Sequence, residues 1–313
     1  MDISVIVPAY NSSKTIINCL RSIFDQTYPC KEVILIDDGS SDNTVSIVSS
    51  IFPMVQIYSQ KNSGPSVARN LGILNSTYEW VAFLDSDDVW ECSILENYYK
   101  IHLKNKDLKW IATSYLMSFN DSKTKSIIYS GKYYKDDRIF NLFLAYSDFR
   151  HRVYAELITT CSVIINKNFF SKSFFFDEKF KNGEDIDLWF RLSLISNEIG
   201  YCRIPGFKYS RNVDTSITSF HARNFDKKQN NLLRISNSWN ILNHSNKTIK
   251  IQASYVLNIW IYRELKSIIK SLNFSLISII LKSNYYKYLS LKNRIIICFV
   301  SFLLFSILLK NFI

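Results

Sequence analysis

Three carboxylates follow a hydrophobic run in the segment WVAFLDSDDVW, residues 80–90. The run has the apolar composition of a strand, and Asp85, Asp87 and Asp88 come directly after it. Carboxylates beside a core are costly unless a positive group meets them. The spacing of Asp85 and Asp87 lets both converge on one hard cation, and Mg²⁺ or Mn²⁺ commonly bridges such carboxylates to a diphosphate. We therefore expect a metal that carries a nucleotide diphosphate, although a D-x-D pair alone is a weak signal.

Strand-like and helix-like segments alternate through the first hundred residues. We expect strands at 3–7, 32–36, 55–58 and 80–84, and helices at 13–25, from Asp42 or Asn43 through 51, and from Gly64-Pro65-Ser66. This alternation predicts an α/β fold: a mostly parallel central sheet with helices on both faces. Ligands of such sheets bind beyond the carboxyl ends of the strands.

Polar residues stand at three of these strand ends. They are Pro8-Ala9-Tyr10-Asn11, Asp37-Asp38 and Asp85-Ser86-Asp87. The convergence of three ends is stronger support for a site than any single pair. Because Asp favours turns and helix caps, a capping role for Asp37 or Asp38 stays open.

The pattern changes after Lys104. We expect strands at 110–119 and 126–129 in a hairpin region, a helix at 138–146, a strand at 160–165 and a last strand at 199–204. Asn182-Gly183-Glu184-Asp185 precedes an amphipathic helix predicted at 186–195. No internal repeat is visible.

The charge is unevenly distributed along the 313 residues, whose formal net charge is +11. Residues 221–313 hold 14 Lys/Arg and two Asp/Glu, whereas residues 1–220 hold 24 and 25. A basic C-terminal region suggests an anionic partner, either membrane lipid or nucleic acid. Its charges are interleaved with long aliphatic runs, so we expect a membrane surface and no nucleic acid.

An unbroken apolar run, residues 295–309, lies between basic residues near the C-terminus. It is shorter than the roughly 20 residues that a spanning helix needs. We interpret it as a tilted, re-entrant or interfacial membrane segment. The alternative is a buried C-terminal helix.

Six cysteines are scattered without a CxxC pair, so neither a zinc site nor a dense disulfide framework is predicted. Reduced thiols in a cytosolic compartment are the default interpretation. The N-terminal MDISVIVPAYN has no basic region and no cleavage site, and we expect a first strand there rather than a secretion signal.

The chain resembles the inverting family 2 glycosyltransferases of the GT-A fold. The matching stretches are ISVIVPAYN (3–11), SIFDQTYPCKEVILIDDGSSDNT (22–44), NSGPSVARNLG (62–72), WVAFLDSDD (80–88) and FDEKFKNGEDIDLWFRL (176–192). They occur in the family's order across about residues 2–215. The resemblance implies a Rossmann-like GT-A domain at 1–220, with a nucleotide-sugar half at about 1–105 and an acceptor half at about 106–220. A basic helical region, 221–313, follows it.

The resemblance also implies roles for single residues. The nucleotide-sugar site would comprise Pro8, Ala9, Tyr10, Asp37, Asp38, Arg69, Asp85, Ser86 and Arg211. Asp87, with Asp85, would hold Mn²⁺ or Mg²⁺. A surface salt bridge is the alternative for Arg69.

Asp185 is the catalytic base that the resemblance implies, and Glu184 and Trp189 are the residues expected to contact the acceptor. Asp185 would take the proton of an acceptor hydroxyl as its oxygen attacks the anomeric carbon. Attack opposite the diphosphate would convert an α-linked UDP-sugar into a β-glycoside. Glu184 is the alternative base, and a core position is the alternative for Trp189 and for Trp90.

The sequence departs from the family in one segment. Many members carry a Tyr-Arg-x-His-like segment after the last strand, where this chain has Tyr209-Ser210-Arg211-Asn212. Arg211 can keep a phosphate role, but the His is absent. The contribution that this His would make to closing the loop over the diphosphate is therefore not expected here, and His221 is either a downstream substitute or a solvated residue.

These features favour an enzyme of bacterial O-antigen or capsule repeat-unit synthesis. Its donor would be a hexose or N-acetylhexosamine on UDP, and its acceptor a polyprenyl-diphosphate-linked saccharide at the cytoplasmic face of the inner membrane. One alternative is a non-enzymatic membrane scaffold on an inactive transferase fold, which the intact acidic residues oppose. The other is a nucleotidyltransferase, which would need a Gly-rich phosphate loop that Pro8-Ala9-Tyr10-Asn11 lacks.

Overall fold

The computed structural model describes residues 1–119, 124–131, 134–140, 157–170, 175–180, 183–196 and 198–211. The predicted apolar segment 295–309 and the basic region 221–313 lie outside these residues. The chain divides into two units, Met1–Asn224 and Phe225–Ile313, and the description below concerns the first. Among the described residues, no helix is long and apolar enough to cross a membrane.

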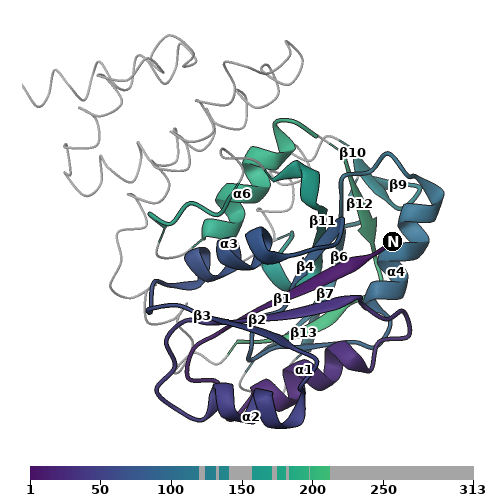
Figure 1. The fold of residues 1–313 in the computed structure, drawn as a ribbon. Helices are drawn as coiled ribbons and strands as arrows, with labels where there is room; N and C mark the ends of the chain where they lie inside the picture. Colours follow the sequence, from purple (N-terminus) through teal and green to yellow (C-terminus); the bar gives the residue numbers. More distant parts are fainter. Residues whose placement is uncertain are drawn as a thin grey trace, which may run out of the picture. The chain divides into compact units, whose positions relative to one another are not determined.

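Within the described part of the chain, one sheet has nine strands in the order β3-β2-β1-β4-β11-β6-β12-β10-β9 (Figure 1). A second sheet has the order β5-β13-β7-β8. The strands of the first sheet are β1 (Ile3–Ala9), β2 (Glu32–Asp37), β3 (Gln56–Ser59), β4 (Trp80–Phe83), β6 (Trp110–Thr113), β9 (Tyr134–Lys135), β10 (Arg138–Phe140), β11 (Val163–Asn166) and β12 (Glu198–Cys202). Those of the second are β5 (Val89–Trp90), β7 (Tyr115–Phe119), β8 (Thr124–Ile127) and β13 (Phe207–Arg211).

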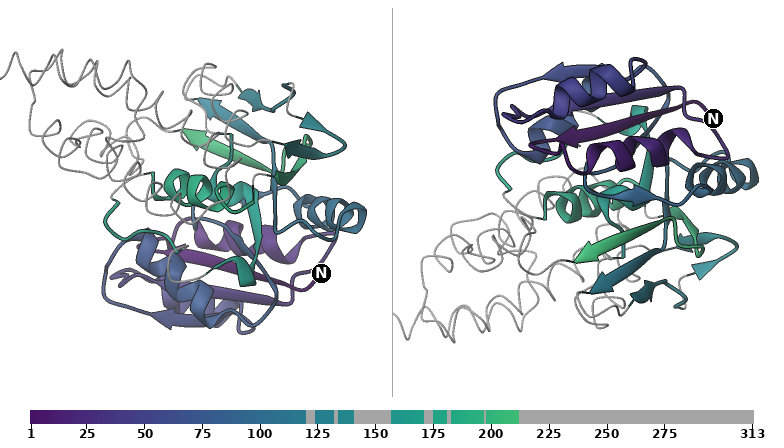
Figure 2. Two further views of the ribbon diagram at one scale, coloured as in Figure 1. Left: turned by 90° about the horizontal axis from the view of Figure 1, so that it is seen from above. Right: turned by 90° about the horizontal axis from the view of Figure 1, so that it is seen from below.

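The helices cover both faces of the first sheet, as the sequence predicted. They are α1 (Ile16–Phe24), α2 (Thr44–Ile51), α3 (Pro65–Asn75), α4 (Ile94–Lys104) and α6 (Glu184–Ser193), with short 3₁₀ turns η1 (Thr160–Ser162) and η2 (Lys167–Phe169). In Figure 1, α3 and α6 lie on one side of β1 and β4, and α1 and α2 lie on the other. Figure 2 shows β1–β3 with α1–α3 gathered on one side of this unit and the strands of the second sheet on the other.

The expected parallel arrangement is continuous only from β3 to β4, and it recurs once more between β6 and β12. β3, β2, β1 and β4 are parallel neighbours, but β11 is antiparallel to both β4 and β6, and β10 is antiparallel to both β12 and β9. Parallel neighbours need a crossover, usually a helix. The strand–helix alternation ends at α4. The later strands join the sheet beside β4, some parallel and some antiparallel to their neighbours. The sheet is therefore mixed rather than mostly parallel.

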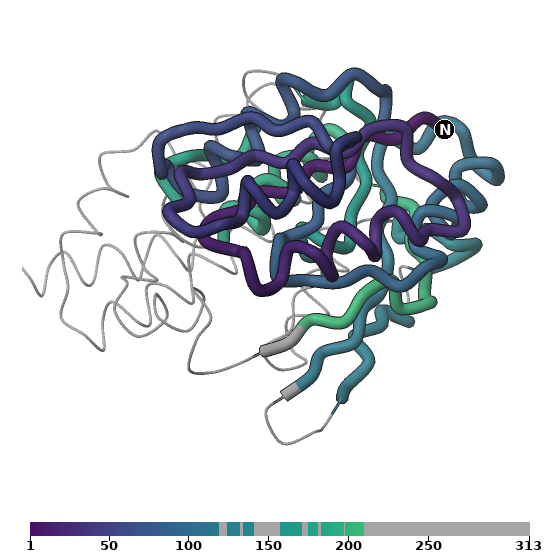
Figure 3. The backbone as a smooth tube through the Cα atoms, turned by 60° about the horizontal axis from the view of Figure 1, so that its bottom comes forward, coloured from purple at the N-terminus to yellow at the C-terminus, as the bar shows by residue number. Residues whose placement is uncertain are grey.

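Several predicted elements of the second half differ from the structure. The expected strand 110–119 divides at Ser114 into β6 and β7, which belong to different sheets. The helix predicted at 138–146 is wrong for its first three residues, which form β10 because they pair with β12; the other residues lie outside the described part. β13 follows the strand that was expected to be the last. The predicted hairpin is confirmed as β7 and β8, which extends beside β13 in Figure 3.

Close packing of α3 on β1 depends on Gly72. A Cβ atom at this position would lie 2.4 Å from Cγ2 of Ile6, a fully buried residue of β1. Glycine therefore lets α3 approach the sheet, and this approach fixes the height of the α3 side chains above the strand ends. Pro65 occupies the first turn of α3, as predicted, where its missing N–H costs nothing.

We predict that Gly72→Ala lowers the free energy of unfolding. Overpacking a core typically costs about 1–3 kcal/mol, which exceeds the gain of about 1 kcal/mol from replacing a helical glycine. Urea unfolding of the full chain would measure the change, with Leu74→Ala on the exposed face of the same helix as the control. A variant as stable as the wild type would contradict the packing described here.

Candidate active site

The carboxyl ends of β2, β1 and β4 meet at one edge of the sheet, as the sequence predicted. In the register of the parallel strands, Ala9 of β1 is opposite Asp37 of β2. Pro8 and Ala9 are buried within β1, so of the expected base-binding residues only Tyr10 presents an accessible side chain, with half of its surface exposed. An exposed aromatic ring at this edge is suited to stacking on a planar ligand.

Asp38 orders the loop that precedes α3. Its Oδ1 accepts hydrogen bonds from Nε2 of Gln60 at 2.7 Å and from the backbone N of Ser63 at 2.8 Å, and its Oδ2 accepts one from the backbone N of Gly64 at 2.8 Å. The carboxylate is buried. Asp38 therefore has a structural task in addition to the nucleotide-sugar contact that the resemblance implied, and that contact stays a prediction.

Asp37 and Ser86 are also bound by neighbouring protein groups. Asp37 accepts a hydrogen bond from the backbone N of Ser40 at 3.1 Å, which fits the turn-capping alternative. Ser86 is buried, and its hydroxyl lies 2.7 Å from that of Ser12. Both side chains hold loops at the strand ends, and a direct contact with a nucleotide sugar stays a prediction for each.

Arg69 of α3 joins two parts of the chain that are distant in sequence. Its Nη2 donates to Oδ1 of Asp85 at 2.7 Å, and its Nη1 donates to Oε1 of Glu184 at 2.7 Å. Arg69 is only 4% exposed, so the surface salt bridge that was its alternative is excluded. Burial disfavours its cation, but the charges of Asp85 and Glu184 outweigh burial and raise the pKa of Arg69. The positive group that meets the first carboxylate of the acidic segment is therefore an arginine.

Asp185 lies in the first turn of α6. Gly183 caps this helix with φ 76°, and Glu184 and Asp185 are its first two residues. An ionised carboxylate is favoured at a helix N-terminus, because the helix dipole is positive there. Oδ1 of Asp185 accepts a hydrogen bond from the backbone N of Ile186 at 2.7 Å, and the residue is half-buried. Its position next to Glu184, an Arg69 partner, brings it to the same site as Asp85.

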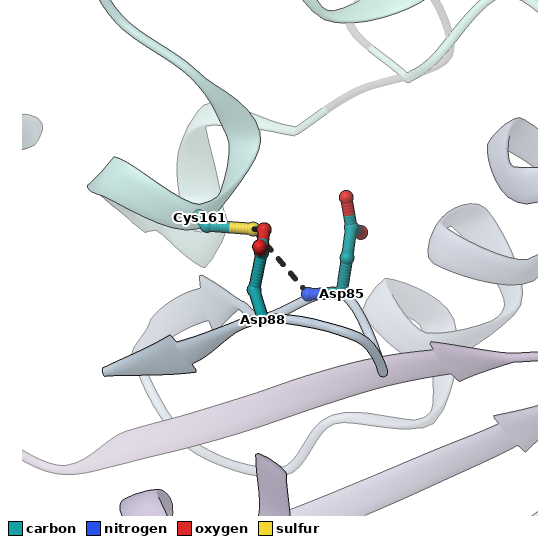
Figure 4. Close-up of side chains that lie close together, drawn as sticks. All are labelled: Asp85, Asp88 and Cys161. Carbon is teal, nitrogen blue, oxygen red and sulfur yellow. Dashed lines mark hydrogen bonds between the residues drawn. The ribbon is translucent and has the colours of Figure 1, made fainter. Parts of the chain in front are cut away.

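The other acids of the segment differ in accessibility. Asp87 is exposed, and among the described residues no cation lies within ion-pair distance of its carboxylate. Asp88 is buried, and its Oδ2 accepts a hydrogen bond from Sγ of Cys161 at 3.2 Å. Figure 4 shows the Asp88 carboxylate beside this sulfur, with Asp85 next to them. Ligand atoms of Asp85, Asp88 and Cys161 lie within 4.8 Å of one another, and this group does not include Asp87.

The donor chemistry decides which of these residues fits a hard cation. Burial, followed by the charges of Asp85 and Asp88, raises the pKa of Cys161 well above its usual value, so this thiol stays protonated. A protonated thiol is not a metal ligand. A cation shared with a dissolved diphosphate needs accessible oxygens, which Asp87 and the partly exposed Asp85 offer. Asp85 and Asp87 therefore fit Mg²⁺ or Mn²⁺ better than the Asp88–Cys161 pair does.

The carboxylates of this edge differ from a buried acid at the opposite end of the sheet. Burial alone would raise the pKa of Glu32, but hydrogen bonds from Ser4, Gln56 and Thr77 lower it overall. By contrast, desolvation and the charge of Asp85 raise the pKa of Asp87. Unrelieved carboxylate repulsion is typical of functional sites. The raised pKa of Asp87 therefore adds to the geometric case for a site at the carboxyl edge.

Two residues of the site were missed by sequence reasoning. Asn70 follows Arg69, and its side chain bonds both the backbone O of Phe176 at 2.9 Å and the backbone N of Phe176 at 3.0 Å. The guanidinium of Arg69 lies 5.5 Å from the centroid of the Phe176 ring. The signal was present, because Asn70 and Phe176 both fall in the quoted motifs, but their pairing is visible only in three dimensions.

The remaining predicted residues lie away from a ligand surface or outside the description. Trp189 is 1% exposed and packs edge-on against Phe176, so the core alternative holds and the acceptor contact expected of it does not fit. Trp90 is likewise buried, and its Nε1 donates to the backbone O of Cys161. The backbone of Arg211 ends β13, but its side chain, like His221, is outside the described part.

Residues 4–151 match the family model described as Glycosyl transferase family 2. An uncharacterized glycosyltransferase of Rickettsia bellii is 31% identical over 242 residues, which are 71% of this chain and 32% of that protein. The glycosyltransferase GlyG of Streptococcus pneumoniae serotype 4 is 35% identical over 117 residues, 36% of this chain and 38% of that protein. The chain spans about a third of the length of the first curated relatives it matches.

Solved structures share the fold. The S. aureus TarS 1-349 structure in complex with UDP-GlcNAc is 18% identical, has a TM-score of 0.65 and covers 96% of this chain and 79% of that one. The same protein in complex with UDP has a TM-score of 0.61 at 18% identity, covering 94% and 77%. These findings support a mixed α/β fold of the GT-A type. The match over residues 4–151 agrees with the family resemblance of the sequence motifs, and the activity of the whole chain is a proposal.

We predict that Asp88→Asn stabilises the protein at neutral pH. Burial, then the charges of Asp85 and Asp87, raise the pKa of Asp88 well above its usual value. The unfolded chain therefore loses this proton first as pH rises, so the carboxylate lowers the free energy of unfolding near pH 7 and has no such effect below about pH 4. Asn keeps an oxygen that can accept from Cys161.

Urea unfolding with EDTA present, at pH 7 and pH 4, would measure this effect. The stabilisation should be present at pH 7 and vanish at pH 4, and the exposed Asp107→Asn should change little at either pH. Destabilisation of equal size at both pH values would contradict the electrostatic origin.

Proposed function

We propose that this chain, whose residues 4–151 carry a glycosyltransferase family 2 domain, transfers a hexose or N-acetylhexosamine from a UDP-sugar to a saccharide hydroxyl. The observation that carries the proposal is the pair of 2.7 Å contacts from Arg69 to Asp85 and to Glu184. These contacts bring the acidic strand end and the helix bearing Asp185 to one site. The TarS structures with UDP and UDP-GlcNAc support the choice of UDP.

The donor would lie across the carboxyl edge of β2, β1 and β4. Tyr10 is exposed there and can stack on the base, as its half-exposed ring permits.

Asp185 is the proposed general base. The acceptor hydroxyl gives its proton to Asp185 while its oxygen attacks the anomeric carbon, and the bond from that carbon to the diphosphate oxygen breaks on the opposite face. The configuration inverts, so an α-linked donor gives a β-glycoside. Asp185 lies in the first turn of α6, where the helix dipole favours the negative carboxylate, the form that accepts a proton.

Asp85 and Asp87 are the proposed ligands of Mn²⁺ or Mg²⁺. When bound, the cation would supply positive charge that stabilises the departing diphosphate. Asp87 supports this assignment because it is open to solvent, while the protein atoms packed around its carboxyl and then the charge of Asp85 raise its pKa. A cation would relieve the repulsion between the two carboxylates.

The acceptor and the location are proposed from the sequence alone. The basic region 221–313 and the apolar run 295–309 fit an anionic membrane surface, so we propose a polyprenyl-diphosphate-linked saccharide at the cytoplasmic face of a bacterial inner membrane. O-antigen or capsule repeat-unit synthesis is the corresponding setting. An inactive scaffold would not need Asp85, Asp87 and Asp185 together at one site.

We predict that Asp185→Asn slows the hydrolysis of UDP-GlcNAc to UDP and GlcNAc, in which water takes the place of the acceptor hydroxyl, by about 100-fold or more. A positioned general base typically contributes about 10²–10⁴-fold. UDP affinity, measured by calorimetry with Mn²⁺, should stay within about threefold of the wild type since Asp185 acts on the acceptor. Asp107→Asn, at an exposed acid outside the site, is the control. Turnover near the wild-type rate in Asp185→Asn would refute this base.

We predict that deletion of residues 295–313 releases the protein from membranes. Removing an apolar segment removes the burial that anchors it, while the basic residues that stay give only salt-sensitive attraction. Sedimentation with vesicles containing anionic lipid, at low and high salt, would measure binding. Undiminished sedimentation of the truncated chain at high salt would show that the tail is not the anchor.

A further inference from the structure

Arg69 divides its guanidinium between two carboxylates of different origin. Asp85 follows β4, 16 residues away in sequence, and Glu184 begins α6, 115 residues away. Each carboxylate receives its own terminal nitrogen at 2.7 Å, so the planar group fixes the separation of the two partners. A lysine has a single charged nitrogen and cannot reproduce this geometry.

Packing reinforces the same connection. The Arg69 guanidinium lies over the Phe176 ring, which packs edge-on against Trp189 of α6 with ring centroids 6.0 Å apart. Asn70 holds the backbone of Phe176 from the adjacent position of α3. Charge and packing together therefore fasten α6 to α3.

We propose that Arg69 is a positioning residue, which holds the first turn of α6 and with it Asp185 in a fixed place relative to Asp85. The proposal rests on the proposed function for the role of Asp185 as the base. Glu184 is then the anchor of α6, neither an acceptor contact nor the base. A change of charge at Asp85 is transmitted to α6 through Arg69.

Single substitutions of Asp85, Glu184 and Arg69 each leave a different part of the ion-pair cluster intact. Asp85→Asn keeps the Arg69–Glu184 pair, and Glu184→Gln keeps the Arg69–Asp85 pair. Arg69→Lys keeps the positive charge but loses one of the two contacts. Asp87→Asn removes a neighbouring charge that has no ion-pair partner among the described residues, and it is the matched control.

Amide hydrogen exchange of the full chain without ligand is the first test. Breaking a buried ion pair is strongly destabilising, so Arg69→Lys and Asp85→Asn should accelerate exchange of the hydrogen-bonded α6 amides from Asp187 onward by at least about tenfold. Asp87→Asn should change it by less than about twofold. Exchange in α6 that is unaffected by Asp85→Asn, in folded protein, would overturn the proposed coupling.

Steady-state kinetics separate positioning from nucleotide binding. With UDP-GlcNAc as the probe, Arg69→Lys and Glu184→Gln should lower kcat for UDP release by about 100-fold, the size of effect expected for a base displaced by about 1 Å, with KM within about threefold. Glu184→Asp should recover part of the loss. A raised KM at unchanged kcat would instead assign Arg69 to the nucleotide and overturn the proposal.

Failure of the two proposals can be told apart. A wild-type chain that neither binds UDP nor releases it from UDP-GlcNAc contradicts the proposed function. The exchange experiment needs no ligand and still decides whether Arg69 connects Asp85 to α6.

Discussion

A buried guanidinium bound by two carboxylates is the interaction on which the rest of this site depends. Arg69 is 4% exposed, and its charge is compatible with burial only because Asp85 and Glu184 lie 2.7 Å away. Removing one partner of a buried ion pair typically costs about 3–5 kcal/mol. The fold places the two carboxylates beside Arg69. Gly72 lets α3 approach β1, the parallel strands bring Asp85 to the edge of the sheet, and α6 begins at Glu184. The packing of the fold and the charges of the site therefore both depend on the position of Arg69.

The nucleotide half of the site could be predicted from the sequence because local rules suffice there. Strand–helix alternation up to α4 predicted parallel strands, and parallel strands bring Tyr10, Asp37 and Asp85 to one edge. Gly183 and the acids that follow it predicted the start of a helix. In the structure Arg69 links the first residue of that helix, Glu184, to Asp85. The identity of the matched domain was also accessible, because its motifs are ordered along the chain.

The second half could not be predicted in the same way, because long-range pairing decides it. Residues 138–140 have helical spacing but pair with β12, and the run 110–119 divides between two sheets. The orientation of side chains could not be predicted from the sequence either. Asp87 and Asp88 are neighbours, but Asp87 is exposed and Asp88 accepts a hydrogen bond from the thiol of Cys161. Trp189 is an aromatic residue of the kind that often stacks on sugars, but on α6 its side chain points into the core and is buried.

The central claim is that this edge binds a nucleoside diphosphate together with a divalent cation. Thermal unfolding of the full chain, followed with UDP in the presence and absence of Mn²⁺, tests it most directly. A ligand at 100 times its Kd stabilises the folded state by about 2.7 kcal/mol, which is readily measured. We predict a rise in Tm with UDP that requires Mn²⁺. No rise with UDP under either condition, in protein that unfolds cooperatively, would contradict the claim.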